Sequence, residues 1–190
     1  MKFRKLAVTA AAVFAIATPA SANELLYQGV TFETLASGNT LTLIIRNALT
    51  GATGNWEDVQ YFKAFEIKEI GNVTGATLDG WNSTVDQGLA SASGCNTGGT
   101  PGACFYQATA IPLTDLMSFT IAFSGTDLNF DSPSLKVQFL TGISDTKATG
   151  DLLSQTIPIP EPEIYAMMAA GLGLVGWAAR RRKLKEAAAA

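Results

Sequence analysis

Short runs in the middle of the chain alternate between apolar and polar residues. Residues 40–45, 119–123 and 135–139 each place an apolar side chain at every second position. Because successive side chains of a strand point to opposite faces of a sheet, this period of two predicts strands with one buried face. In the segment at 135–139, Lys136 and Gln138 are then expected to face water.

Further strand-like segments follow the same pattern more weakly, and turn-forming clusters separate them. The segments are residues 27–35, 60–67, 105–111 and 152–157, and the turns fall at residues 37–39, 50–55, 71–72 and 132–133. No long stretch with helical period lies between residues 23 and 159. Seven or eight short strands predict an all-β domain, an antiparallel β-sandwich, with a barrel as the alternative architecture.

The first 22 residues have the pattern of a secretory signal peptide. Basic residues precede an apolar run at residues 6–17, which we expect to be helical, and Ala20 and Ala22 form the small-x-small pattern that signal peptidase reads. We expect cleavage after Ala22, which makes Asn23 the first mature residue. A retained membrane anchor is the alternative, but a run of about a dozen residues is too short to span comfortably.

The C-terminal part combines a proline motif, an apolar run and a basic cluster. The apolar run at residues 164–179 has 16 residues. As a helix it would reach about 24 Å, whereas a hydrocarbon core is about 30 Å thick. We expect a short transmembrane helix whose basic neighbours snorkel, with everything before residue 164 outside the membrane. A helix buried in the globular domain is the alternative. The motif is Pro160, Glu161 and Pro162, and the basic stop is Arg180, Arg181, Arg182 and Lys183.

Three regions follow from these patterns. They are the signal peptide at residues 1–22, one β-sandwich domain at residues 23–157 and the tail at residues 158–190. The whole chain has a net charge of −3, but residues 23–159 contain five basic and 13 acidic residues, a net charge of −8. An acidic domain with scattered cations repels nucleic acid, which excludes that class of partner.

Two cysteines, Cys95 and Cys104, lie nine positions apart in a stretch rich in glycine. In an exported chain this spacing predicts a local disulfide, which would stabilise the fold by about 2–3 kcal/mol. A catalytic thiol and a metal-binding pair are the alternatives. Neither has support, because the chain has no histidine and no further cysteine.

The absence of histidine also limits the chemistry of the chain. It removes Ser-His-Asp and Cys-His nucleophilic sites and the common zinc sites. Carboxylate pairs such as Glu57 with Asp58, or Glu66 with Glu69, are candidates for glycoside hydrolysis by residue type alone. In an acidic domain such pairs are expected at the solvated surface. We therefore predict no catalytic residues, no cofactor and no enzymatic activity.

One segment has the opening of a calcium-binding loop. Asp127, Asn129 and Asp131 have the Asp-x-Asn-x-Asp spacing, but Ser132 replaces the usual glycine and Gln138 replaces the usual glutamate at position twelve. In a strand the three polar groups would share one face. A polar outer face that runs into a turn is therefore the preferred interpretation, and no metal is predicted.

Several aromatic residues are candidates for carbohydrate stacking. Trp56 and Trp81, with Tyr61 and Tyr106, lie in or near turn-rich segments where partial exposure is plausible. The preferred interpretation is that they pack on the sandwich. Glycan contact by Trp56 and Trp81 is the alternative.

The tail resembles a known sorting signal. The order of Pro160-Glu161-Pro162, a short apolar helix and an arginine-rich end, paired with a signal peptide, resembles the PEP-CTERM sorting signal of Gram-negative bacteria. In that family an exosortase, a membrane-embedded enzyme that resembles cysteine transpeptidases, recognises the tail. Its substrates are exported and linked to exopolysaccharide and biofilm matrix. The resemblance implies a sorting route and does not imply an activity.

Together these patterns predict an exported, non-enzymatic protein of the cell surface or extracellular matrix. Its expected partners are signal peptidase, the inner membrane during a transient stage, an exosortase-like enzyme and exopolysaccharide. A lectin-like polysaccharide-binding module is the alternative, and a glycan-active enzyme is the third hypothesis.

Overall fold

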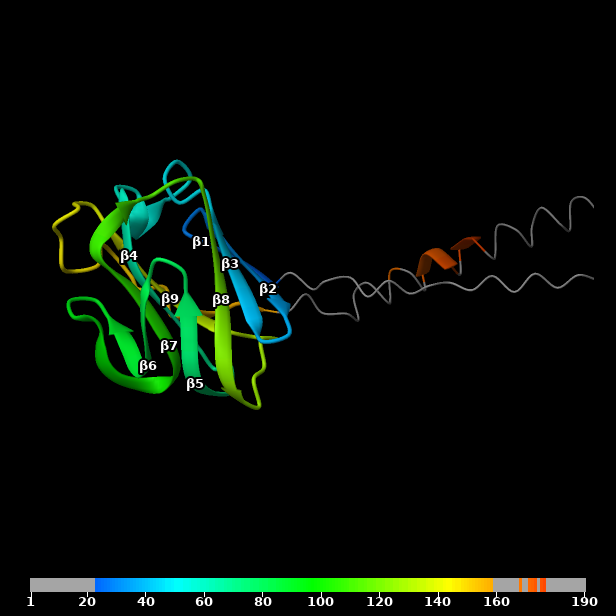
Figure 1. Cartoon of the computed structure of the whole chain (residues 1–190). Coiled ribbons are helices and arrows are strands. Elements are labelled where there is room, and N and C mark those ends of the chain that lie inside the picture. The colour runs from blue at the N-terminus through cyan, green and yellow to red at the C-terminus, as the bar shows by residue number, and fades with distance from the viewer. Residues whose placement is uncertain (1–22, 159–167, 169–170, 174, 177–190) are drawn as a thin grey trace, which may run out of the picture.

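The computed structural model describes residues 23–158, Met168, residues 171–173 and residues 175–176. Residues 23–158 form two antiparallel five-stranded sheets (Figure 1). Across the first sheet the order is β1 (Asn23–Tyr27), β2 (Val30–Ser37), β3 (Thr40–Arg46), β8 (Leu116–Thr126) and β5 (Asn72–Leu78). Across the second it is β10 (Gln155–Thr156), β9 (Ser134–Leu140), β4 (Tyr61–Lys68), β7 (Gly94–Pro112) and β6 (Asn82–Ala90). The predicted all-β, antiparallel fold is confirmed.

The two sheets bury their apolar faces against each other. Alternating residues of the long strands point inward, and aromatic rings join the layers, as in the pair Phe32 and Phe139 with centroids 6.5 Å apart. Phe65 and Phe119 meet in the same way at 5.4 Å. Burial of each such side chain stabilises the fold by about 1.5–3 kcal/mol, so this shared core holds the sheets together as a sandwich.

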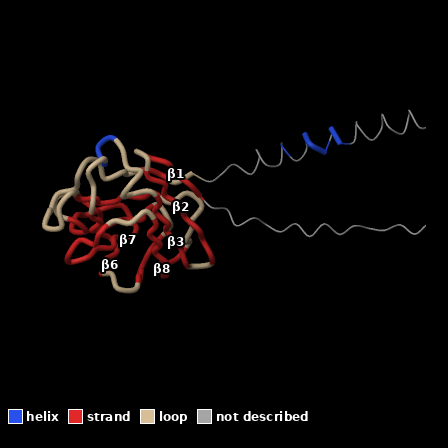
Figure 2. Tube along the Cα trace, turned by 90° about the horizontal axis from the view of Figure 1, so that it is seen from above, coloured by secondary structure: helices blue, strands red, loops and turns tan. Residues whose placement is uncertain are grey.

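Regular structure outside the strands is slight. Within residues 23–158 the one helical element is a 3-10 turn, η1 (Gly54–Trp56), at the edge of the domain (Figure 2). Its Trp56 side chain is fully buried between the sheets. The turn-rich loop predicted at residues 50–55 thus closes one end of the core.

The number and bounds of the strands differ from the prediction. The strand expected at residues 27–35 is divided by a turn at Gln28 and Gly29 into β1 and β2. Gly29 has a φ of +79° and lies against the carbonyl of Gly51, so a side chain there would collide with that carbonyl. The segment at 152–157 forms only the two-residue strand β10, because Leu153 and Ser154 have positive φ.

Two strands, β5 and β6, were not predicted. The apolar side chains of β5 are small or irregularly spaced around Gly75, and β6 begins with the polar residues Asn82, Ser83 and Thr84. Neither strand therefore shows a clear period of two. The described region contains ten strands, where the sequence predicted seven or eight.

The two ends of the domain meet at one loop. The Asn23 side-chain amide donates to the carbonyl of Phe130 at 3.3 Å, and the Ile157 amide donates to the carbonyl of Pro133 at 2.9 Å. The first and last described residues of the domain therefore lie on the same side of the sandwich (Figure 1). The segments that precede and follow the domain are attached at that side.

Most of the predicted targeting segments lie outside the described residues. These segments are the signal peptide at 1–22 with Ala20 and Ala22, the Pro160–Pro162 tripeptide and the basic cluster at 180–183. Of the apolar segment at 164–179, Met168, residues 171–173 and residues 175–176 are described, and they are helical and exposed. Within the described residues, no helix combines the length and the apolar character that crossing a bilayer requires.

Candidate functional site

A hairpin lies across the outer face of the second sheet. The end of β6 and the start of β7 pair with two register shifts, one of them at Asp86, which has a φ of +61°. Such bulges bend a strand out of the plane of its sheet. Residues 87–96, which we call the strap, therefore cover the outer side chains of β4 and β9.

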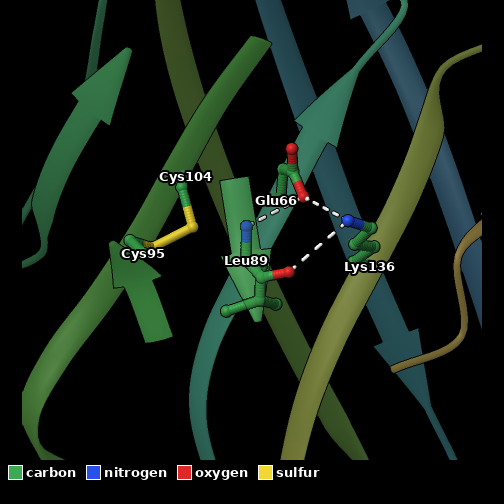
Figure 3. A network of polar contacts seen from close by, with 5 residues as sticks. All are labelled: Glu66, Leu89, Cys95, Cys104 and Lys136. Carbon is green, nitrogen blue, oxygen red and sulfur yellow. Dashed lines mark hydrogen bonds and ion pairs between the residues drawn. A yellow bond between two sulfur atoms is a disulfide. The ribbon is translucent and has the colours of Figure 1, made fainter. Parts of the chain in front are cut away.

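A buried ion pair holds the backbone of one residue of the strap. Glu66 on β4 is 1% exposed, and its Oε2 lies 3.2 Å from Nζ of Lys136 on β9. The same oxygen accepts a hydrogen bond from the Leu89 amide at 3.0 Å, while the Lys136 ammonium donates to the Leu89 carbonyl at 3.4 Å. Figure 3 shows both side chains pointing toward the Leu89 peptide. The two charged groups form an ion pair with each other. They also form hydrogen bonds to the backbone amide and carbonyl of Leu89.

This arrangement corrects two sequence predictions. Lys136 and Gln138 were expected to face water, and Glu66 was expected at the solvated surface. The Gln138 side chain is instead 1% exposed, and Glu66 is equally buried. The prediction was wrong because it assumed an uncovered sheet face, whereas the strap covers that face.

The predicted disulfide between Cys95 and Cys104 is confirmed. It joins the strap to the part of β7 that belongs to the sheet. Both cysteines pack with Ala64 and Leu89 in a second, smaller apolar cluster under the strap. The disulfide, the Glu66–Lys136 pair, apolar packing and the hydrogen bond from Gln138 to the Ser91 carbonyl therefore fasten the strap to the sheet.

A cavity of about 360 Å³ lies between the strap and the sheet. Its floor includes Ala64, which pairs in register with Tyr106 on β7 and with Gln138 on β9. Ala64 is itself fully buried against Cys95 and Leu89 of the strap. The polar side chains that line the cavity belong to Lys63, Gln87, Ser93, Asn96, Tyr106, Gln107, Gln138 and Thr146.

Lys63 reaches this cavity because of a β-bulge. The pairing of β4 passes from Phe62 directly to Ala64 in both of its ladders, so Lys63 is unpaired in each. A bulge in a central strand re-aims one side chain. Among the described residues the ion pairs are Arg46 with Glu33 and Lys136 with Glu66, so the ammonium of Lys63 has no carboxylate partner there.

Gln138 presents an unused acceptor. Its Nε2 donates to the carbonyl of Ser91 at 3.0 Å and to the carbonyl of Thr146 at 3.2 Å. Its Oε1 is buried without a hydrogen-bond partner. An unpaired buried polar atom costs about 1–3 kcal/mol, so this oxygen lowers the stability of the region under the strap.

The aromatic platform proposed from the sequence is not present. Trp56 is 0% exposed, donates from Nε1 to the Asp151 carbonyl at 3.0 Å and packs edge-on against Phe139. Trp81 packs against Phe62 and two further phenylalanines of the core. Glycan contact by Trp56 is therefore wrong, and the packing interpretation holds for Trp56 and Trp81. The aromatic side chain at the cavity is Tyr106, which is 37% exposed.

The other candidate groups lie apart from the cavity. Glu57, Asp58 and Glu69 are exposed. Residues 127–131 lie in a loop after β8, where Asn129 accepts a hydrogen bond from the Asp131 amide at 2.8 Å, so the expected strand geometry is absent. Within the described residues, no three Cys, Asp or Glu side chains gather as a metal site would need.

Neither Lys63 nor Gln138 could be assigned to this cavity from the sequence. Lys63 lies in an ordinary strand pattern, and its role depends on a bulge that only the pairing of three strands shows. Gln138 was expected to face water, because the sequence does not show that the strap covers this face of the sheet. Neither residue belongs to a motif with characteristic spacing.

Comparison with protein families identifies the tail. Residues 158–183 match the model of the PEP-CTERM protein-sorting motif. The chain carries a PEP-CTERM sorting motif. The match begins at Pro158, where the described domain ends. A search of curated proteins and a search of solved structures each found no match.

The PEP-CTERM motif determines the general route of the protein. It implies an exported bacterial surface protein that an exosortase-like enzyme processes at the membrane. The motif covers the tail and leaves the β-sandwich unassigned, so the cavity beneath the strap stands as a separate candidate site.

Proposed function

We propose that this protein is a non-enzymatic component of the surface or extracellular matrix of a Gram-negative bacterium. The observation that carries the proposal is the PEP-CTERM motif at residues 158–183. In this account signal peptidase removes residues 1–22, and residues 164–179 hold the precursor at the inner membrane. An exosortase-like enzyme then cuts near Pro160–Pro162 and releases the sandwich to the outside.

The length of the apolar segment supports a temporary hold. Its 16 residues would form a helix of about 24 Å, shorter than a hydrocarbon core of about 30 Å. A bilayer can adapt to this difference in length at a modest free-energy cost. The short helix is therefore suited to hold a precursor that is later released. The prolines at 158, 160 and 162 favour an extended segment that a processing enzyme can engage.

A structural or binding role is supported by the chemistry of the domain. The chain contains no histidine, and the one strongly buried carboxylate among the candidates, Glu66, is occupied by Lys136 and Leu89. The carboxylates of Glu57 and Asp58 are exposed at the surface. The sandwich is therefore proposed to act through its surface and not through catalysis.

The sorting step can be tested by cell fractionation. A variant with Pro160, Glu161 and Pro162 all changed to alanine should accumulate in the inner-membrane fraction, whereas the wild-type protein should reach the surface or the medium. Glu163→Ala is the matched control, because it removes a nearby carboxylate outside the tripeptide. Equal release of the triple variant and the wild type would contradict the proposal.

A further inference from the structure

We propose that the cavity between the strap and the second sheet binds a sugar residue that carries a carboxylate, as a uronic acid does. This inference depends on the proposed function in one respect only: the extracellular location would bring the protein into contact with such a sugar. The site itself consists of Lys63, Tyr106 and Gln138, with Gln87 and Asn96 on the strap side.

The charges of the cavity favour an anion. The domain has a net charge of −8, yet no carboxylate belongs to the described lining of the cavity, and its one charged group is the Lys63 ammonium. That ammonium has no acidic partner among the described residues. A carboxylate within reach of it would form a charge-assisted hydrogen bond, which is about twice as strong as a neutral one. Because the Lys63 side chain is half-buried, fewer water molecules compete with a ligand for its ammonium group.

The remaining polar groups fit hydroxyls. The Gln138 side chain lines the cavity while its Nε2 donates to the carbonyls of Ser91 and Thr146, so the exposed amides on the strap side supply the contacts to a ligand. The side-chain amides of Gln87 and Asn96 each offer a donor and an acceptor, and no hydrogen bond within the described residues occupies them. A sugar residue supplies neighbouring hydroxyls that both donate and accept.

Tyr106 supplies the apolar contact. Its side chain is 37% exposed and lines the cavity next to the methyl group of Ala64. Aromatic faces bury apolar surface well while the hydroxyl stays in water. The C–H face of a sugar ring can pack on this ring while its carboxylate reaches Lys63. The volume of about 360 Å³ is at the small end of the range for ligand pockets, which suits one residue of a longer chain.

The test uses isothermal titration calorimetry on the purified exported protein, with tri-galacturonic acid as the anionic probe. Galactotriose, which lacks the carboxylates, is the neutral probe. We expect measurable binding of tri-galacturonic acid, and Lys63→Gln and Tyr106→Ala should each weaken it by about tenfold or more. Lys68→Gln is the matched control, because it removes the same charge from the same strand away from the cavity. It should leave the affinity within about twofold of the wild type.

Each other outcome overturns the proposal. These outcomes are no binding of tri-galacturonic acid, equal binding of both probes, equal losses in Lys63→Gln and Lys68→Gln, and full displacement by equimolar inorganic phosphate, which would indicate a general anion site. Matching melting temperatures of wild type and variants exclude misfolding as the cause of a lost affinity. Because the test does not involve the tail, failure here would leave the sorting account intact, and failure of sorting would leave this result intact.

Discussion

At the scale of single residues, the Glu66 carboxylate defines the unusual face of this sandwich. It is almost fully buried on the face of a sheet that normally contacts water, and it is compensated by Lys136 and the Leu89 amide. Alternation along β4 predicts correctly that Glu66 points away from the main core. It cannot show that residues 87–96 return to cover that side, because the covering segment is more than twenty positions away in the sequence.

The two partners of the ion pair should differ in their effect on stability. Lys136→Met leaves a buried carboxylate without its cation and should lower the free energy of unfolding by about 3 kcal/mol. Glu66→Gln keeps an acceptor for the Leu89 amide and leaves Lys136 free to reach water, so its cost should be about 1 kcal/mol. Urea denaturation of both variants and of the double variant measures the coupling. Equal losses in the two single variants would contradict this asymmetry.

Asp115 provides a prediction of pH dependence. The Thr50 backbone amide at 2.9 Å, the Thr50 hydroxyl at 2.8 Å and the Leu49 amide at 3.2 Å hold the pKa of the Asp115 carboxyl below its ordinary value. A carboxyl with a lowered folded-state pKa stabilises the fold above its unfolded-state pKa, and that contribution is lost as the pH falls through the folded-state pKa. Wild type should therefore exceed Asp115→Asn in melting temperature at neutral pH.

This difference should shrink as the pH falls from the unfolded-state pKa of Asp115 through its lower folded-state pKa. Thermal melts of both proteins across the acid range measure it, and Asp58→Asn is a control carboxylate on an exposed loop. A difference between wild type and Asp115→Asn that stays constant through the acid range would show that the ionised carboxylate does not hold the 47–50 loop.

At the scale of elements, the sequence predicted the strongly alternating strands and missed the irregular ones. Residues 119–123 and 135–139 lie within β8 and β9 as expected, because burial of one face imposes a period of two. The strap and the bulge at Lys63 depend on pairing between distant strands. No local pattern records such pairing, so the cavity that these elements form was not predictable from the sequence.

The disulfide should stabilise the strap more than the rest of the sandwich. Cys95→Ser combined with Cys104→Ser should lower the free energy of unfolding by about 2–3 kcal/mol, because the short covalent loop no longer restricts the unfolded chain. Amide hydrogen exchange should accelerate mainly in residues 87–96, with β3 and β8 least affected. Ser93→Ala, at an exposed strap residue, is the control. Unchanged exchange in the strap would show that the ion pair and apolar packing suffice to hold it.

At the scale of the whole molecule, two kinds of information are combined in one chain. The tail contains a linear motif that is readable from the sequence, and the family comparison at residues 158–183 confirms it. In the sandwich, the strap and the cavity beneath it can be recognised only in the folded structure. Both ends of the domain meet at the loop formed by residues 130–133, so the tail leaves from the same side on which the mature chain is expected to begin.

The central claim is that the tail holds the exported precursor at the membrane for processing and is then removed. Intact-mass spectrometry of the protein recovered from the surface or medium of the native bacterium tests it most directly. The account predicts a chain that begins at Asn23, ends near Pro160–Pro162 and lacks residues 164–190. A recovered protein whose mass includes residues 164–190 would contradict it.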